Sequence, residues 1–399
     1  MKNLTNQITT EFEKRFGEDY LLVESPGRVN LIGEHTDYNE GFVLPAAVDK
    51  SIVLAMKTNQ RSEGRFYAVD KQESYQTDLS GSLEKTGNGW PDYLLGVVDQ
   101  LREHGFEVDG FDCVFGGDIP IGAGMSSSAA LEGGVLFGLT QLYDLEIGPV
   151  EMAQIAQKAE NEFVGVQCGI MDQFVSLNGR ADHALKLDCR SLEYEFYPFK
   201  QEDVRIVLCD TGVRRELASS EYNVRRQQCE QGVATLQEFD PDIQSLRDVE
   251  LMFLLRHQDD MDPLVFKRCK YVVEENKRVL KACQDLKVGH IESFGQRMLQ
   301  SHIGLRNDYE VSCKELDTLV DIAWDIHGVL GARMMGGGFG GCTINLVKEE
   351  QVEQFIERIT SEYAEILGKQ VEIYRTNVSQ GTHLINTADL ASSKLFNDK

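Results

Sequence analysis

Residues 116–134 read GGDIPIGAGMSSSAALEGG, and they join a predicted strand at residues 111–115 to a predicted helix at about residues 126–143. Gly122 and Gly124 permit positive φ angles and a close approach to the backbone, and the serines that follow suit the start of a helix. The first N–H groups of a helix have no partner within it, and together with the helix dipole they attract anions. The stretch therefore predicts a phosphate-binding turn, with a glycine-rich turn before an ordinary capped helix as the equally good alternative.

This turn differs from the common nucleotide-binding motifs. It contains no lysine or arginine, so it is not the Walker A loop GxxxxGK[ST]. It also lacks the third glycine of GxGxxG, and the chain has neither the HRD nor the DFG triplet of protein kinases. A phosphate bound here would depend on backbone N–H groups and on residues from elsewhere in the chain.

Around the turn, strand and helix patterns alternate, which indicates an α+β fold in both halves of the chain. A new unit begins at the strand-like residues 204–209, after the loop-like residues 197–202, so we expect one domain over residues 1–200 and a second over residues 201–399. The other predicted strands are residues 20–24, 29–32, 51–56 and 343–347, and the other predicted helices are residues 92–103, 149–163 and most of 219–327.

The composition excludes several classes of function. Lys and Arg number 40 against 65 Asp and Glu, and the resulting formal charge of −25 would repel a nucleic-acid backbone. No apolar run approaches the ~20 residues that span a bilayer, and the polar start MKNLTNQITTEFEKR is unlike a signal peptide. The nine cysteines are scattered singly, which is typical of reduced thiols in the cytosol. We expect a cytoplasmic protein with no nucleic-acid or membrane partner.

Two carboxylates after the turn are candidates for chemistry. Glu160 borders the apolar stripe of the predicted helix at residues 149–163, where a partly buried acid could bind Mg²⁺ shared with phosphates; a solvated glutamate is the simpler interpretation. Asp172 interrupts the apolar stretch CGIMDQF at residues 168–174, and it could be a general base in a cleft or a helix cap.

Residues 26–41 read PGRVNLIGEHTDYNEG, a short apolar strand followed by a turn at Gly33 and a dense set of polar side chains. Glu34, His35 and Asp37 would be presented together, and such hydrogen-bonding groups suit the hydroxyls of a sugar. A polar surface turn is the alternative, but it explains poorly why so many of these groups follow one short strand.

This segment resembles the galactokinase signature, and GAGMSSSAA at residues 122–130 is similar to the second, phosphate-binding motif of the GHMP kinases. GARMMGGGFGGC at residues 331–342 resembles the third motif of that family. AENEFVGVQCGIMDQF at residues 159–174 and SEYNVRRQQCE at residues 220–230 also resemble galactokinase blocks. The resemblance covers nearly the whole chain, with the three motifs in the family order.

The resemblance implies the two-domain GHMP kinase fold, with a left-handed βαβ crossover in the N-terminal domain, a ferredoxin-like C-terminal domain and the active site in the cleft between them. It implies transfer of the γ-phosphoryl group of ATP to the C1 hydroxyl of galactose in galactose catabolism, giving galactose 1-phosphate and ADP. Galactose and ATP would be the small-molecule partners and Mg²⁺ the cofactor. Separately, we expect a monomer, because no obligate protein partner is evident from the sequence. Met125 and Met335 stand where the family usually has leucine and threonine, and the second change removes a hydroxyl beside the third motif's glycines.

The same resemblance implies roles for particular residues. Asp172 would accept the proton of the C1 hydroxyl, and Arg28 would lie between Asp172 and the γ-phosphate. Ser128 and Glu160 would hold Mg²⁺, and Ala68 is a candidate contact for adenine. The positions that match phosphate-binding residues are Gly122, Ala123, Gly124, Met125, Ser126, Ser127 and Ser128. The positions that match sugar-binding residues are Glu34, His35, Thr36, Asp37, Gly169 and Tyr222.

Two alternatives remain open at this point. An N-acetylgalactosamine kinase shares much of the signature, whereas mevalonate and homoserine kinases share only the glycine-serine turn. A non-catalytic sensor that binds galactose and ATP is also related in sequence, but it lacks two residues of the serine motif. Because SSSAA is complete here and Arg28, Glu160 and Asp172 are all present, the sequence favours catalysis.

Overall fold

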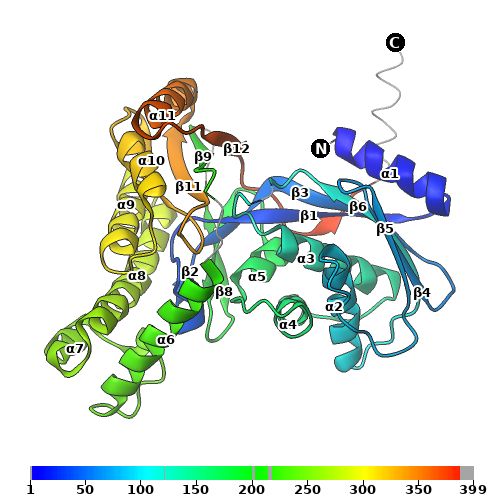
Figure 1. The fold of residues 1–399 in the computed structure, drawn as a ribbon, viewed down its shortest axis with the longest axis horizontal. Coiled ribbons are helices and arrows are strands. Elements are labelled where there is room, and N and C mark those ends of the chain that lie inside the picture. Colours follow the sequence, from blue (N-terminus) through cyan, green and yellow to red (C-terminus); the bar gives the residue numbers. More distant parts are fainter. Residues whose placement is uncertain (1, 121, 200–202, 214–217, 387–399) are drawn as a thin grey trace.

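The computed structural model describes residues 2–120, 122–199, 203–213 and 218–386. Figure 1 shows two lobes: helices α1 to α5 lie in the lobe of the first half of the chain, and helices α6 to α11 lie in the other. The sequence-predicted boundary at residues 200 and 201 lies outside the described residues, and this division into domains stays a prediction.

The first lobe is built on a six-stranded sheet in the order β13-β1-β3-β6-β4-β5. All neighbouring strands are antiparallel except β4 and β6. Its strands are β1 (Leu21–Asn30), β3 (Pro45–Thr58), β4 (Glu63–Ala68), β5 (Glu73–Asp78), β6 (Phe111–Gly117) and β13 (His383–Leu384). Because β13 pairs with β1, the chain returns near its C-terminal end to the sheet that it began (Figure 1).

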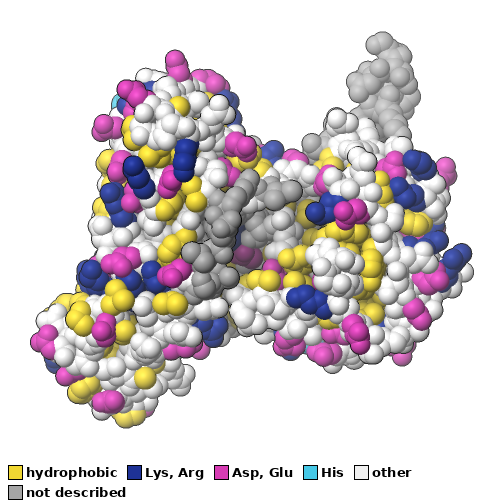
Figure 2. Space-filling view, in the orientation of Figure 1, with side chains coloured by type: hydrophobic (Ala, Val, Ile, Leu, Met, Phe, Trp, Pro, Cys, Tyr) yellow, Lys and Arg dark blue, Asp and Glu magenta, His cyan; other side chains and the backbone are white. Residues whose placement is uncertain are grey.

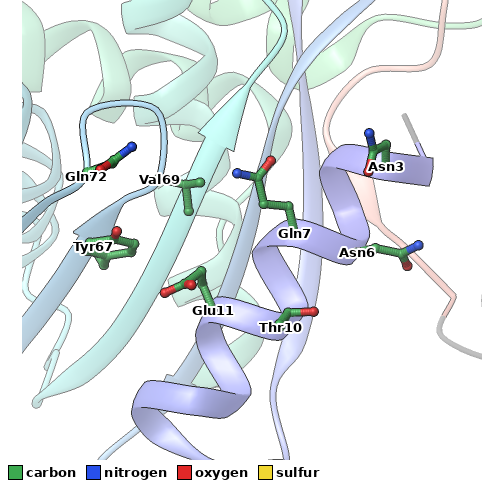
Figure 3. A pocket seen from close by; sticks show the side chains of 8 residues that line it. All are labelled: Asn3, Asn6, Gln7, Thr10, Glu11, Tyr67, Val69 and Gln72. Atoms are coloured by element: carbon green, nitrogen blue, oxygen red, sulfur yellow. The ribbon is translucent and has the colours of Figure 1, made fainter.

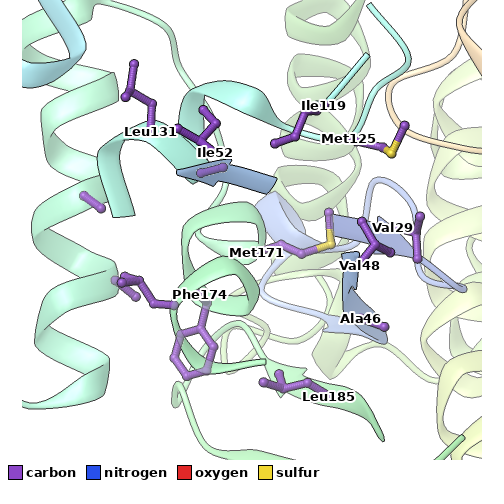
Figure 4. Close-up of a cluster of buried hydrophobic side chains, with 14 of the residues drawn as sticks. Val29, Ala46, Val48, Ile52, Ile119, Met125, Leu131, Met171, Phe174 and Leu185 are labelled. Atoms are coloured by element: carbon purple, nitrogen blue, oxygen red, sulfur yellow. The ribbon is translucent and has the colours of Figure 1, made fainter. Parts of the chain in front are cut away.

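Helices cover both faces of this sheet. On one face, Ile8 and Phe12 of α1 (Lys2–Phe16) pack against Leu22, Val53 and Val114. The main hydrophobic core lies on the other face, and Figure 4 shows part of it. The helices of this core are α2 (Trp90–Glu103), α3 (Ser127–Leu142), α4 (Pro149–Lys158) and α5 (Met171–Asn178).

Strand β1 corrects one prediction from the sequence. Residues 20–24 and 29–32 were predicted as separate strands, but the strand is continuous from Leu21 to Asn30, with a register shift between Pro26 and Arg28. A Cβ on Gly27 would lie 2.6 Å from the carbonyl oxygen of Met125, so only glycine fits this close approach. The irregularity keeps the strand intact and lays Arg28 beside the glycine-serine turn.

A second correction concerns the predicted helix at residues 149–163. The α-helix ends at Lys158 and continues as a π-helical turn over Ala159–Val164. A π turn shifts the phase of the side chains that follow it, and such turns are frequent at functional sites. Glu160, which the α-helical pattern placed at the edge of the apolar stripe, is only 6% exposed.

A second, small sheet is formed by strands from the first half of the chain. Its order is β2-β7-β8, with strands β2 (Phe42–Val43), β7 (His183–Asp188) and β8 (Tyr194–Pro198). Tyr197 and Pro198 therefore end a strand, although the sequence predicted a loop over residues 197–202. Residues 200–202 lie outside the described residues.

The second lobe is built on an antiparallel sheet in the order β10-β11-β9-β12. The strand predicted at residues 204–209 is confirmed as β9, and the one at residues 343–347 as β11; β10 was not predicted. The strands are β9 (Val204–Asp210), β10 (Val329–Met334), β11 (Cys342–Lys348) and β12 (Glu372–Thr376). The helices are α6 (Ala218–Gln237), α7 (Leu251–Arg256), α8 (Pro263–Lys287), α9 (Ile291–Asn307), α10 (Lys314–Trp324) and α11 (Val352–Leu367).

The face of the molecule in Figure 2 shows no large basic patch, as expected from the acidic composition. Figure 2 shows acidic and basic side chains interspersed over both lobes on the face that it presents. Among the described residues, no helix has the length and apolarity that crossing a bilayer requires.

Candidate active site

A buried arginine and an aspartate form the centre of the site. Arg28, near the end of β1, is 7% exposed, and it donates from Nε to Oδ1 of Asp172 over 2.7 Å and from Nη2 to Oδ2 over 2.6 Å. Asp172 lies in the first turn of α5 and is half-buried. Burial opposes the charge of Arg28, but the neighbouring Asp172 carboxylate outweighs this effect, so the pKa of Arg28 is raised. The two side chains therefore form a bidentate ion pair with little freedom to move.

The glycine-serine turn is fastened to this pair. Arg28 donates from Nη1 to the carbonyl oxygen of Gly124 and from its backbone N–H to the carbonyl oxygen of Met125 over 3.1 Å. Ser126 precedes α3 in the left-handed region, with φ of 55°, and its hydroxyl donates to Oδ2 of Asp172 instead of capping the helix. The turn, the arginine and the aspartate thus share one hydrogen-bond network.

The remaining residues of the turn are placed by their burial. Gly122 and Gly124 have positive φ angles of 82° and 73°, as the sequence predicted. Gly122 and Ser127 are exposed, whereas Ala123 is buried. The Met125 side chain joins the hydrophobic core, where it is shown in Figure 4. The apolar side chains of Ala123 and Met125 therefore anchor the turn, while Gly122 and Ser127 are exposed.

The side chain of Glu160 lies next to that of Ser128, at the end of the glycine-serine turn. Its Oε2 accepts from Nε2 of Gln173 over 2.6 Å and lies 3.5 Å from Sγ of Cys168. Burial raises the pKa of Glu160, and a hydrogen bond from the Ser128 hydroxyl opposes this rise. The two metal ligands implied by the sequence are therefore neighbours in the structure.

Two residues around Glu160, Glu132 and Tyr93, were missed by the sequence analysis. Glu132 lies on α3 and is fully buried, with its Oε2 3.4 Å from Nε2 of Gln173. Burial first, and the charge of Glu160 second, raise the pKa of Glu132 well above its usual value. Burial and then Glu160 also raise the pKa of Tyr93 to about 12. The spacing of Ser128 and Glu132 by four residues, which puts them on one helix face, was the available signal.

The polar residues after β1 form the second part of the site. Asp37 begins a short 3₁₀ helix, and burial raises its pKa to about 6, with further contributions from the charges of Asp172 and Glu34. A Cβ on Gly169 would collide with the Asp37 carboxylate, so glycine is required there. Because Gly169 lies against the Asp37 carboxylate and only three positions before Asp172, the two parts belong to one site.

Of the other predicted sugar-binding residues, His35 and Tyr222 pack together as rings, whereas Thr36 bonds within its own loop. Nδ1 of His35 lies 2.8 Å from the Tyr38 hydroxyl, and the Tyr222 ring packs against both rings, with centroids 5.7 and 4.8 Å away. Burial first, and then Asp37, raise the pKa of Tyr222 well above its usual value. Thr36 is fully buried, and its hydroxyl lies within 2.8 Å of two carbonyl oxygens of its own loop. Thr36 therefore braces the loop in this structure.

This loop is held from the second half of the chain. Along α8, Tyr271 donates its hydroxyl to the carbonyl oxygen of Glu34 over 3.0 Å. Glu275 accepts the N–H of Gly33 over 3.0 Å, and Asn276 accepts the N–H of Phe42 over 2.9 Å. The loop at residues 33–42 thus belongs to the first half of the chain but is held by hydrogen bonds to helix α8 of the second half.

Ala68 is not brought into this group. It is 2% exposed and packs in the main core on β4, so the predicted adenine contact stays a prediction. A separate pocket of about 530 Å³ lies between α1 and the end of β4 with the turn that follows it (Figure 3). Its lining includes Asn3, Gln7, Tyr67 and Gln72, and it contains none of the predicted site residues.

Comparisons with known families agree with this arrangement. The family models described as "GHMP kinases N terminal domain" and "GHMP kinases C terminal" match residues 92–180 and 279–365. The fold and the site therefore define a GHMP kinase, and the predicted two-domain fold is confirmed. The model described as "Galactokinase galactose-binding signature" matches residues 10–58.

Comparison with individual proteins shows which family within the GHMP kinases this chain resembles. The galactokinase of a Roseiflexus species is 42% identical over 378 residues, covering 94% of this chain and 96% of that protein. That of Clostridium beijerinckii is 40% identical and covers 96% and 100%. The crystal structure of Lactococcus lactis galactokinase complexed with galactose matches with a TM-score of 0.91 and 35% identity, over 95% of this chain and 99% of that one. The chain belongs to the galactokinase family, which confirms the predicted class of ATP-dependent sugar kinase.

Proposed function

We propose that this protein transfers the γ-phosphoryl group of ATP to the C1 hydroxyl of α-D-galactose, giving galactose 1-phosphate and ADP. The observation that supports this most directly is the position of Asp172, which lies between a helix N-terminus suited to phosphates and a loop of sugar-binding side chains. A phosphoryl acceptor bound by that loop would meet the base and the donor at one place.

Asp172 is the proposed general base. A carboxylate has about four lone-pair positions, and Arg28 and Ser126 together donate three hydrogen bonds to it. One position remains on Oδ1 for the hydroxyl of the sugar. Arg28 holds the carboxylate in place and carries a positive charge that stabilises the negative charge developing on the transferred group.

The turn at residues 122–128 and the start of α3 would bind the phosphates of ATP. Ser128 and Glu160 would hold Mg²⁺, and they fit it because they offer adjacent hydroxyl and carboxylate oxygens, the ligands that this cation prefers. Among the described residues no group of three His, Cys, Asp or Glu could hold a metal ion, so phosphate oxygens and water would complete the coordination. The chemistry supplied at this place would be neutralisation of phosphate charge by the cation that Ser128 and Glu160 hold.

The sugar would be recognised by Glu34, His35, Asp37 and Tyr222. Carboxylates that accept from particular hydroxyls are left unpaired when an epimer turns one hydroxyl away. A site of this kind can discriminate by ~10⁴ between substrates, far more than an apolar pocket achieves. Gly169 leaves room for Asp37 to approach the sugar side of the site.

An ADP-release assay tests this proposal, with purified protein, ATP, Mg²⁺ and each of galactose, N-acetylgalactosamine, glucose and mevalonate. We expect kcat/KM for galactose to exceed that for the C4 epimer glucose by at least about 10³, and ADP release without sugar to be the background. Comparable values for the two epimers would reject the galactose assignment and leave the kinase class intact. A higher value for N-acetylgalactosamine would transfer the assignment to the amino sugar.

A further inference from the structure

A fully buried arginine of the third glycine motif reaches across to the sugar loop. Arg333 lies on β10 and is 0% exposed. Its Nε donates to the carbonyl oxygen of Leu31 over 2.9 Å, and its Nη1 donates to that of Met334 over 2.7 Å. Its Nη2 donates to the carbonyl oxygen of Asn30 over 2.5 Å and to Oε1 of Glu34 over 3.0 Å.

The carboxylate of Glu34 is therefore oriented by the other half of the chain. Its Oε1 also accepts the backbone N–H of Gly336 over 2.8 Å, so both donors come from the third motif. The side chain is buried, and both hydrogen bonds fall on the same oxygen. No hydrogen bond from the described residues reaches Oε2, which would therefore be available to accept from a sugar hydroxyl.

We propose that Arg333 is a positioning residue that sets the orientation of Glu34 and thereby the affinity for the sugar. This inference rests on the proposed function, because it takes Glu34 to be a sugar ligand. A guanidinium presents donors in a rigid planar fork, so it can span the end of β1 and the carboxylate together, which a lysine cannot do. Loss of the Nη2 donor would leave the Gly336 N–H as the remaining donor to Oε1, and the Glu34 carboxylate would be less firmly oriented toward the sugar.

The third motif has little freedom to compensate for such a loss. Gly336 and Gly338 have φ angles of 79° and 80°, and a Cβ on Gly338 would collide with the carbonyl oxygen of Val311. The backbone of Met335 is paired with Cys342 over 2.9 Å. The position of Glu34 is thus tied to a loop whose own conformation is fixed.

The substitution Arg333→Lys tests the inference, with galactose affinity measured by calorimetry in the absence of ATP and with separate KM values for the two substrates. We expect Kd and KM for galactose to rise at least about tenfold, as for the loss of one charge-assisted hydrogen bond, while KM for ATP changes less than about threefold. Arg268→Lys is the matched control, because Arg268 is also buried but bonds Asp308 and Glu310. The control should lower the melting temperature and leave galactose affinity unchanged.

A double-mutant cycle with Glu34→Gln decides whether Arg333 acts through Glu34. If it does, the double variant loses little more galactose affinity than Glu34→Gln alone, so the two effects are not additive. Additive losses, or an equal rise of both KM values in Arg333→Lys, would overturn the proposal.

Amide hydrogen exchange decides the matter if Arg333→Lys does not fold. Galactose alone should slow exchange in residues 334–338 of the wild-type protein, and this protection should disappear in Glu34→Gln. Unchanged exchange in the wild-type segment would count against the coupling. A wild-type protein that binds no galactose would instead reject the proposed function, and this inference with it.

Discussion

The proposed catalytic side of the site, around Arg28 and Asp172, and the proposed sugar side, at residues 33–42, are held in place by different parts of the chain. Arg28 and Asp172 pair with each other, and their further partners come from the glycine-serine turn. All of these residues belong to the first lobe. The sugar loop also belongs to the first half of the sequence, but Glu275 and Arg333 of the second half hold it.

Because the two sides are held differently, substitutions on them should affect different measured quantities. The catalytic side is prearranged by helices α3 and α5, which pack in one core, so a change there should act on the chemical step. The sugar side depends on how the two halves meet, so a change there should act on galactose affinity. Three predictions test this division, beginning with the largest effect.

Asp172→Asn should lower kcat by about 10²–10⁴, the range for removal of a positioned general base. The amide keeps the shape of the side chain, and galactose affinity should change little because the sugar loop is held from elsewhere. Single-turnover rates and calorimetry with galactose measure the two quantities. Asp259→Asn, at an exposed aspartate, is the control. A variant with nearly normal kcat would remove Asp172 from the mechanism.

Glu160→Gln should raise the Mg²⁺ concentration for half-maximal rate by about 10- to 100-fold, the range for disturbing a metal's ligand environment. The substitution keeps the volume and removes the charge. Titration of the initial rate with Mg²⁺ at fixed ATP measures the effect, and Glu162→Gln, exposed on the same π turn, provides the control. An unchanged Mg²⁺ dependence would mean that Glu160 binds no metal.

The kcat/KM for galactose should depend on pH because Asp37, on the sugar side of the site, changes its ionisation. Asp37 has a pKa of about 6, and only its carboxylate form accepts hydrogen bonds at both oxygens. As the pH falls from 7 to 5, kcat/KM for galactose should decrease about tenfold, following the ionised fraction of a group with this pKa. The free-enzyme profile measures it, and Asp37→Asn should abolish the inflection. An inflection retained in that variant would assign it to another group.

The raised pKa of Asp37 also makes the stability of the folded protein depend on pH. The folded-state pKa of Asp37 lies above the ordinary value of 3.8, because burial disfavours the charged form. Its contribution to stability is therefore fully present below pH 3.8 and is lost as the pH rises through about 6. The protein maintains an ionised Asp37 at neutral pH at some expense in stability, which is typical of a functional carboxylate.

Local patterns predicted the parts of this site that are local in sequence. The turn at residues 122–128 and the signature at residues 26–41 are compact motifs, and they drew attention to Gly122, Gly124 and the residues after β1. The sequence singled out Glu160 but did not predict how deeply it is buried, because a periodicity of 3.6 residues cannot reveal a π turn. Resemblance to the family supplied the roles that the pattern left open.

The long-range contacts could not be predicted from patterns. Glu34 and Arg333 lie 299 positions apart, and nothing in the sequence around either residue indicates the other. Arg333 stands in a glycine-rich motif in which the glycines attract attention first. Glu132 was likewise hidden inside a helix of small residues, and its proximity to Glu160 depends on how α3 packs against the π turn.

The most direct test of the central claim is the identity of the product. The protein is incubated with galactose, ATP and Mg²⁺, and the phosphorylated sugar is examined by ³¹P and ¹H NMR. We predict a single product with phosphate on C1 in the α configuration, formed in equal amount to ADP. Phosphate on another hydroxyl, or ADP formed without any phosphorylated galactose, would contradict the account.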